Sequence, residues 1–401
     1  MNKIKINKKI SGNVILLGVV SFLTDISSEI IFPILPMFIA ALGGTGLIIG
    51  LIGGLADSIS SLLKVFSGYW SDRLGKRLPF VFSGYGLSGV SKILLSFSSV
   101  WQHAVIFVSL ERVGKGLRTA PRDAIIAESS RGQRGKAFGV HRAMDTSGAV
   151  IGSGIAFVLV YYLGLNFQTI IFAAGIIGFF ALIPLLFLKE KKKKPVEISL
   201  KISLKALPKN FRIFLIIATI FALGNFTYMF FILKAQAAFF DPRMAIAMPI
   251  LLYAWFNLVY AAFSIPAGIF SDRIGRRKVL ALGYVLFAAT CTGFMFSDSL
   301  ILFIIFFALY GITYALIDGN QRAYASDLIP EKLRGTGLGT FHNSTGLVAL
   351  PASLIAGGLW EYFGSDVTFI YGAGLGIIAA ILFVFYGAKR GCSKINSRLP
   401  I

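Results

Sequence analysis

Histidine and cysteine, the residues that most often bind transition metals or act as nucleophiles, are nearly missing from this chain. Its 401 residues include three His and two Cys. Cys291 and Cys392 are too far apart for a disulfide framework or a paired-cysteine metal site. The sequence contains no H-E-x-x-H, G-x-S-x-G or zinc-ligand spacing. We therefore expect no metal, no cofactor and no catalytic residue, which argues against a membrane-embedded enzyme.

Charged residues are also scarce, and acidic ones especially so. The chain is 14% charged and 56% hydrophobic, with 39 Lys and Arg against 18 Asp and Glu. Such a composition is typical of a polytopic α-helical membrane protein. The net charge of +21 could suggest nucleic acid, but the basic residues stand in short groups between apolar runs. That pattern follows the positive-inside rule, so the expected surroundings are a lipid bilayer and not nucleic acid.

Long apolar runs divide the chain into membrane-spanning segments. A helix needs about 20 apolar residues to cross a hydrocarbon core of roughly 30 Å. The sequence predicts twelve spans, approximately 14–41, 46–70, 78–99, 102–127, 136–163, 167–188, 212–238, 246–270, 279–297, 300–327, 336–361 and 367–388. The first run is too long for a cleavable signal and contains acids, so it should remain as a helix. Every second connection is basic, which predicts a multi-pass protein of the cell membrane with both termini in the cytoplasm.

One ten-residue segment occurs in each half of the chain. Gly68-Tyr-Trp-Ser-Asp-Arg-Leu-Gly-Lys-Arg77 returns 200 residues later as Gly268-Ile-Phe-Ser-Asp-Arg-Ile-Gly-Arg-Arg277. The same offset relates Asp25 to Asn225. These matches predict a duplicated architecture, with a binding site between the repeats near the middle of the membrane. The expected parts are a first bundle over 1–189, a cytoplasmic linker over 190–211 and a second bundle over 212–401.

The repeated loop resembles the cytoplasmic signature between the second and third helices of major facilitator superfamily transporters. The resemblance covers nearly the whole chain and implies an all-α fold of twelve transmembrane helices in two pseudo-symmetric six-helix bundles, with a monomer sufficient. In that family the loop helps to hold the outward-facing state. The resemblance implies a conformational gate made of Asp72, Arg73, Arg77, Asp272 and Arg273, with Asp123 or Glu128 as the partner of Arg73. The alternative is a topological anchor with no conformational role.

The fourth span carries most of the charge expected inside the membrane. Arg112-x-x-x-Gly116 looks like the family's fourth-helix motif, whose arginine is linked to proton coupling, although Lys115 replaces the usual Gln. Ionisable residues in a membrane cost about 2.5 to 3.5 kcal/mol each and usually face a cavity or a partner. The spacing of Glu111, Lys115, Arg118 and Arg122 puts them on one helix face, which predicts a cationic cavity wall. Neutralisation by neighbouring acids is the alternative.

The fifth span has the glycine spacing of the family's antiporter motif at Gly139, Gly148 and Gly152, but Ser153 stands where that motif has proline. Next to these glycines lie His141, Arg142 and Asp145, which suit either a proton carrier or a structural network.

The first span holds Asp25 and Glu29, one turn apart near the expected midplane. Two adjacent carboxylates cannot easily both stay charged away from water, so proton binding near physiological pH is expected. Structural pairing with Lys64, Lys92 or the cations of the fourth span is the alternative. Glycines at 46, 50 and 54 repeat every four residues on the second span, and we expect them to serve close helix packing.

These residues lead to a functional hypothesis. A surplus of buried cations favours an organic anion or an amphipathic solute, and the substrate-binding candidates are Lys92, Lys115, Arg118, Arg142, Asn225 and Arg322. The proton-coupling candidates are Asp25, Glu29, Glu111, Arg112 and Asp145. We expect a secondary active transporter that uses the proton gradient and alternating access, with export by proton antiport favoured. The alternatives are proton symport of an anionic metabolite or siderophore and a transport-inactive receptor of the same fold.

Overall fold

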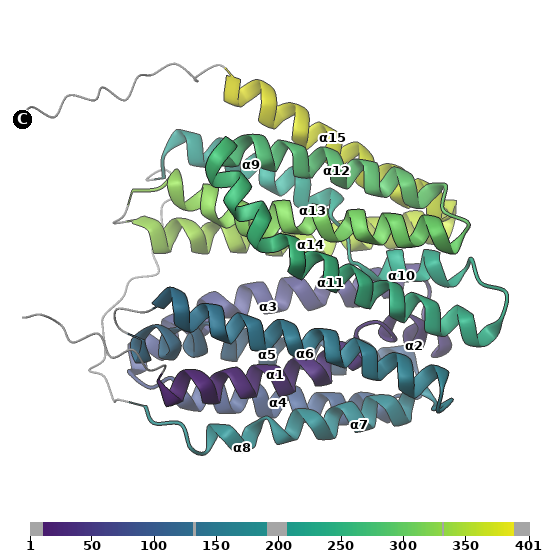
Figure 1. Ribbon diagram of the computed structural model, residues 1–401, viewed down its shortest axis with the longest axis horizontal. Helices are drawn as coiled ribbons and strands as arrows, with labels where there is room; N and C mark the ends of the chain where they lie inside the picture. The colour runs from purple at the N-terminus through teal and green to yellow at the C-terminus, as the bar shows by residue number, and fades with distance from the viewer. Residues whose placement is uncertain (1–10, 131–133, 191–206, 331–332, 389–401) are drawn as a thin grey trace, which may run out of the picture.

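The computed structural model describes residues 11–130, 134–190, 207–330 and 333–388 (Figure 1). Within these ranges the chain forms α-helices and no strand. The helices are α1 (Gly12–Ile31), α2 (Leu35–Ala41), α3 (Gly46–Leu74), α4 (Leu78–Ser96), α5 (Trp101–Ser129), α6 (Arg134–Tyr161), α7 (Phe167–Phe180), α8 (Leu182–Leu185), α9 (Lys209–Gly224), α10 (Met229–Gln236), α11 (Pro242–Ile274), α12 (Arg276–Met295), α13 (Leu300–Asp327), α14 (Arg334–Phe363) and α15 (Ser365–Ala388). Each predicted span corresponds to one helix or to two consecutive helices.

Eleven segments of the described chain are long and apolar enough to cross a membrane. The predicted span that does not meet this criterion is α5, because it carries seven charged side chains between Glu111 and Glu128. Its length of 29 residues matches that of α3, and it packs against both α3 and α4. We therefore treat α5 as a twelfth span whose charges are sheltered by its neighbours.

Successive spans run in alternate directions, so the connections between them gather at two ends of the molecule (Figure 1). We call one of them the basic end, since it carries the repeated loops at 71–77 and 271–277 together with the start of α1 and the end of α15. The opposite end carries the connections at 42–45, 97–100 and 237–241. The placement of the basic end in the cytoplasm stays a prediction from the charge pattern.

Three of the predicted spans are divided into two helices, and at two of these breaks, α1/α2 and α9/α10, backbone groups find partners on other spans. Between α1 and α2, Pro33 cannot donate a backbone hydrogen bond, and the carbonyl of Phe32 accepts one from the Tyr228 hydroxyl at 3.2 Å. Between α9 and α10, the Thr227 amide donates to Ser353 Oγ at 3.1 Å. Non-helical backbone is tolerated at membrane depth only when it is satisfied in this way.

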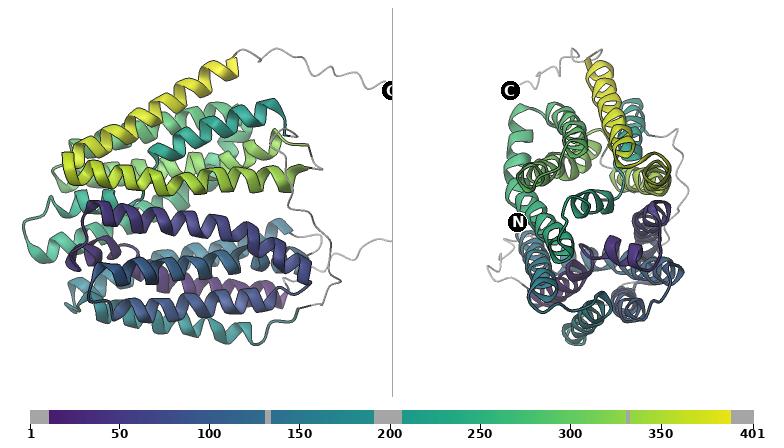
Figure 2. Two further views of the ribbon diagram at one scale, coloured as in Figure 1. Left: turned by 180° about the vertical axis from the view of Figure 1, so that it is seen from behind. Right: turned by 90° about the vertical axis from the view of Figure 1, so that its right-hand side faces the viewer.

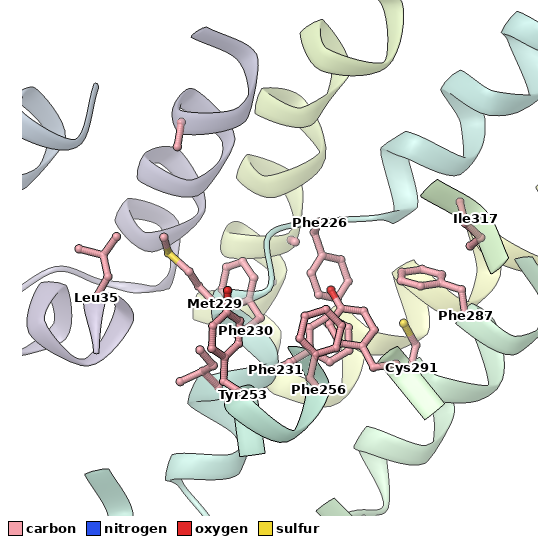
Figure 3. Close-up of a cluster of buried hydrophobic side chains, with 14 of the residues drawn as sticks. Leu35, Phe226, Met229, Phe230, Phe231, Tyr253, Phe256, Phe287, Cys291 and Ile317 are labelled. Carbon is pink, nitrogen blue, oxygen red and sulfur yellow. The ribbon is translucent and has the colours of Figure 1, made fainter. Parts of the chain in front are cut away.

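The helices form two repeated halves, α1–α8 and α9–α15, which lie side by side (Figure 2). The second half is held by stacked aromatic rings, with Phe231 at the centre (Figure 3). Its ring lies 4.3 Å from that of Tyr310 and 4.8 Å from that of Phe294, centroid to centroid. These rings belong to a hydrophobic core that also includes Leu35 of α2, so apolar packing crosses between the halves near the opposite end. The predicted linker 190–211 lies largely outside the described residues, and α9 already begins at Lys209.

The most extensive contact between the halves is made by α3 and α14. A Cβ atom placed on Gly54 would lie 2.7 Å from the Leu350 Cα atom, and one on Gly46 would lie 3.0 Å from the Trp360 ring. A Cβ atom on Gly50 would overlap the Ser353 carbonyl. The two backbones therefore approach as closely as glycine allows, and the prediction that these residues serve helix packing is confirmed.

Hydrogen bonds reinforce this contact from the middle of α3 to the opposite end. Ser58 Oγ donates to the Gly346 carbonyl at 2.7 Å and accepts from the Leu350 amide at 3.1 Å. At the start of α3, the Leu47 amide donates to Glu361 Oε2 at 3.0 Å. Glu361 of the second half thus caps the N-terminus of a helix of the first half, where a carboxylate also offsets the positive end of the helix dipole.

We predict that Gly54→Val separates α3 from α14 at the opposite end, because its side chain would meet the backbone of Leu350. Overpacking of this kind typically costs about 1 to 3 kcal/mol. Spin labels at Ala41 and Tyr362, both exposed at this end, should report a longer distance than in the protein with Gly54.

The matched control is Gly154→Val on α6, where an added Cβ atom meets nothing within 4 Å. It should leave the label distance unchanged. Equal distances in the two variants would contradict the assigned role of Gly54.

Candidate functional site

Charged side chains from both halves gather in the middle of the molecule. Lys64 of α3 lies within electrostatic reach of Lys115 and Arg122 of α5, and of Arg322 on α13. Arg142 of α6 likewise lies within reach of second-half groups on α11 and α13. We call this set the central charged region, and its members are Asp25, Glu29, Asp57, Lys64, Lys115, Arg122, Arg142, Asp145, Asp318 and Arg322.

Two predicted proton-coupling acids meet in this region. Asp25 of α1 lies within hydrogen-bonding reach of Asp145 on α6. A hydrogen bond between two carboxyl groups requires one of them to carry a proton. Asp145 also accepts from Ser21 Oγ at 2.9 Å and from Arg142 Nη1 at 2.9 Å. Asp145 thus has more hydrogen-bond donors around it than Asp25.

Glu29, one turn further along α1, contacts the second half directly. Its Oε2 atom accepts a hydrogen bond from Asn257 Nδ2 of α11 at 3.3 Å. Tyr253, one turn before Asn257, is also within hydrogen-bonding reach of Glu29. The carboxyl group of Glu29 therefore connects the two halves near the middle of the bundle.

The charges of α5 point in two directions instead of forming one wall. The guanidinium of Arg112 lies 4.6 Å from the centre of the Phe32 ring and 3.2 Å from Glu111, and Lys115 Nζ lies 6.0 Å from the same ring. Arg118 turns towards α4, where its guanidinium lies 4.3 Å from the Tyr85 ring. The prediction of a single cationic face is therefore wrong, because packing against α4 removes Arg118 from it.

Lys92 lies inside the first half and not between the halves. It is 2% exposed, and its ammonium group donates to Ser27 Oγ at 2.9 Å and Ser28 Oγ at 2.8 Å. Arg118 is similarly enclosed, with 5% of its surface exposed. Of the predicted substrate-binding cations, Lys115, Arg142 and Arg322 are the ones that belong to the central charged region.

The second half contributes fewer charges but several hydroxyl and amide groups. Arg322 pairs with Asp318 on the same helix, and the Tyr260 hydroxyl donates to Asp318 Oδ2 at 2.9 Å. Asn225, at the break between α9 and α10, accepts a 3.5 Å hydrogen bond from the Tyr314 hydroxyl. This side of the region is therefore amphipathic, with tyrosine rings beside polar groups.

At the basic end, Arg77 is the centre of the first repeated loop. It pairs with Asp72 at 2.6 Å and with Glu128 of α5. Partial burial disfavours its charge, but the hydrogen bonds to these two carboxylates outweigh that effect and raise the pKa of Arg77 above its usual value. Glu128 was predicted as a partner of Arg73, whose side chain instead donates to the Tyr69 hydroxyl at 3.4 Å.

Two further partners in this loop differ from the expectation. Asp123, the other predicted partner of Arg73, pairs with Arg122 on its own helix at 2.9 Å. The carboxylate at the N-terminus of α4 is that of Glu190, which accepts from the amides of Arg77 and Leu78 at 2.6 and 3.0 Å. Glu190 follows the first bundle in the sequence, so no local motif marked it as this cap.

The second copy of the loop is built differently. Asp272 pairs with Arg276 at 3.3 Å, and Arg276 also pairs with Asp327 of α13 at 2.8 Å. Arg273 is exposed at the end of α11. The ion pair to a neighbouring helix is therefore made by Arg276, whereas Arg277, the equivalent of Arg77, donates to the Phe383 and Val384 carbonyls of α15 at 3.3 and 2.6 Å.

Sequence reasoning missed Asn257 at the site and Glu361 at the opposite end. Each stands alone in an apolar stretch, and only its partner across the halves gives it a role. Asp57 of α3 is a further member of the site: it lies within electrostatic reach of Lys64 on its own helix, and Lys64 also lies among cations from two other helices, α5 and α13. In the described ranges no group of three His, Cys, Asp or Glu side chains could hold a metal ion.

Comparison with known proteins agrees with this architecture. The model of the Major Facilitator Superfamily matches residues 17–241 and 215–397. An uncharacterised MFS-type transporter of Methanocaldococcus jannaschii is 50% identical over 382 residues, which cover 94% of this chain and 96% of that protein. Multidrug resistance protein MdtG of Serratia proteamaculans is 29% identical over 176 residues, 42% of each chain.

The solved structure of the nucleoside transporter NupG has the same fold. It superposes with a TM-score of 0.78 at 13% identity and covers 93% of this chain and 98% of its own. One conclusion follows from the repeated halves, from the glycine contact between α3 and α14, and from the match of nearly the whole chain to the family model and to the archaeal relative. The chain belongs to the Major Facilitator Superfamily and is a multi-pass membrane transporter.

Proposed function

We propose that this protein is a proton-coupled secondary active transporter of a small organic solute, anionic or amphipathic, that works by alternating access. The observation that carries the proposal is the approach of Asp25 to Asp145 beside Arg142 and Arg122. A pair of carboxyl groups that shares one proton next to cations has the means to exchange that proton for a charged solute. The proton gradient supplies the energy, and no cofactor is needed.

The proposed path of the proton begins at this pair. Arg122 Nη1 donates to Ser21 Oγ at 3.2 Å, and Ser21 in turn donates to Asp145. A negatively charged solute drawn to Arg142 would weaken the hold of this arginine on Asp145. Asp145 would then compete for the proton of Asp25, so solute and proton would influence one another through a shared network.

The proposed solute site is the central charged region. Lys115, Arg142 and Arg322 supply positive charge from three helices, while Tyr260 and Asn225 supply a polar aromatic surface. Such a surface suits a solute that combines an acidic group with an apolar body. The acidic side chains of the region limit its net positive charge. Discrimination between solutes would therefore depend on the position of the acidic group within the solute.

The arrangement of the halves supports alternating access. In the described ranges, the hydrogen bonds between the halves involve residues from the middle of the bundle to the opposite end, such as Glu29, Ser58 and Glu361. Arg142, whose side chain is 62% exposed, lies towards the basic end. With both termini in the cytoplasm, this would be a conformation open to the cytoplasm.

Direction of transport has two candidates. The glycines of α6 at 148 and 152 pack on α1, where added Cβ atoms would lie close to the carbonyls of Phe22 and Ile26. Together with the similarity to the multidrug resistance protein MdtG, this favours export by proton antiport. Proton symport of an anionic metabolite or siderophore is the second candidate, because Ser153 replaces the proline of the antiporter motif.

The location of the protein is part of the proposal. We place it in the cell membrane, with a small-molecule solute and the bilayer as its partners and one chain sufficient for transport. A transport-inactive receptor of the same fold would bind solute without moving it. Solute-dependent proton flux distinguishes these two possibilities.

We predict that Asp25→Asn and Asp145→Asn each abolish proton flux evoked by solute. The probe is a panel of organic anions, amphipathic drugs and siderophores, presented to proteoliposomes that contain a pH-sensitive dye. Asparagine keeps the shape of the side chain but cannot exchange a proton, so the loss should affect coupling and not folding.

Asp366→Asn is the matched control, because Asp366 pairs with Lys234 outside the central charged region. It should retain the flux of the unmodified protein. Flux that survives in both the Asp25 and Asp145 variants would overturn the assignment of the carboxyl pair.

A second prediction concerns solute affinity. Lys115→Gln should raise the half-saturating concentration of an active organic anion at least about tenfold, because a hydrogen bond to a charged group contributes about 1.5 to 3 kcal/mol. Lys209→Gln, at an exposed position at the start of α9, should leave it unchanged. The measurement is equilibrium exchange of the labelled anion without a proton gradient, and equal values for the two variants would remove Lys115 from the site.

A further inference from the structure

A second group of buried charges lies inside the first half, next to the solute site: Lys115 of that site faces the Phe32 ring that lines its pocket. A pocket between α1, α2, α4 and α5 is lined mostly by apolar side chains, with Phe32 and Phe107 among them. Its polar lining consists of Ser91, Lys92, Glu111 and Arg112. The last three are only 2%, 6% and 5% exposed, so their charges are almost fully removed from water.

The hydrogen bonds of these groups are incomplete. The Lys92 ammonium uses two of its three protons on Ser27 and Ser28. Glu111 accepts from Ser88 Oγ at 3.0 Å and lies 3.2 Å from Arg112 Nε. That nitrogen is nevertheless not aligned for a hydrogen bond to any atom of the described chain. Both cations that line the pocket therefore retain donor capacity.

The charges of the pocket also do not balance. Lys92 and Arg112 carry two positive charges against the single negative charge of Glu111. Charges of both signs lie within electrostatic reach of this group: Arg118 and Lys115 are cations, while Asp25, Glu29 and Asp57 are acids. None of these three acids lines the pocket, and Arg112 Nε and Arg118 Nη1 have no hydrogen-bond partner in the described residues. A buried donor without a partner has lost its hydrogen bonds to water without compensation, so an acceptor belongs here.

We propose that this pocket binds a small monatomic anion, chloride under physiological conditions, between the Lys92 ammonium and the Arg112 guanidinium. An oxyanion such as sulfate needs several donors around its oxygens, whereas Ser91 Oγ already donates to the Leu87 carbonyl at 2.7 Å. A spherical halide needs fewer donors, and the positive edges of aromatic rings favour it. The bound anion joins α1, α4 and α5, which gives it a structural role independent of the transported solute.

The first experiment measures halide binding to the unmodified, detergent-purified protein. Radioactive chloride should bind saturably, and chloride or bromide should raise the apparent unfolding temperature along the same saturation curve. Gluconate and sulfate at equal ionic strength should give no such rise. The proposal is overturned if radioactive chloride does not bind to the unmodified protein, or if all four anions stabilise it equally, since the effect would then be one of ionic strength.

Variants locate the site. Lys92→Met should raise the half-saturating chloride concentration at least about tenfold, because it removes a charged donor. Lys92→Arg keeps the charge and should retain saturable binding. Lys234→Met is the matched control, since Lys234 pairs with Asp366 far along the chain, in α15. Chloride affinity that is unchanged in Lys92→Met, or lost equally in Lys234→Met, would show that the halide binds elsewhere and would overturn the assignment.

A direct measurement covers the case in which Lys92→Met does not fold. Crystals of the unmodified protein grown in bromide should show an anomalous peak between Lys92 and Arg112. A peak only at other positions, or none in protein that binds halide in solution, would overturn the proposal.

Discussion

A charge inside a bundle of membrane-spanning helices needs a counter-charge or a polar neighbour within that bundle, and this constraint governs the first half of the molecule. Helix α5 carries seven charged residues, and its neighbours supply what they need. Phe32 and Tyr85 present ring faces to its arginines, while Ser21 and Ser88 bond to Arg122 and Glu111. The position of α5 between α1, α3 and α4 follows from these contacts as much as from apolar packing.

The second half follows another principle. Its core is formed by stacked aromatic rings around Phe231 on α10, and its charges lie near its surface (Figure 3). Such a core is close-packed and therefore deforms little. The two repeats, which share a sequence pattern at Gly68 and Gly268, have thus diverged into a half with several buried charges and a half with a largely aromatic and apolar core.

The sequence predicted the twelve spans, the duplication and the role of Gly46, Gly50 and Gly54, because hydrophobic length, repeats and small-residue spacing are local signals. It did not predict the break at Asn225, since no proline marks it and Ser353 of another helix satisfies the freed amide. It also paired Arg73 with Glu128, where the structure pairs Arg77. A basic loop offers several arginines to the same acid, and only the packing of the helices decides which one reaches it.

The contact of α3 with α14 has a consequence for how the halves separate. Around Gly50 and Gly54 the two helices touch through backbone atoms, and backbone has no rotamers with which to adjust. A slight separation would thus lose this contact, together with the hydrogen bonds of Ser58, and would gain nothing in return. In the proposed alternating-access cycle, we therefore expect this end to be either fully closed or fully open, without stable intermediate openings.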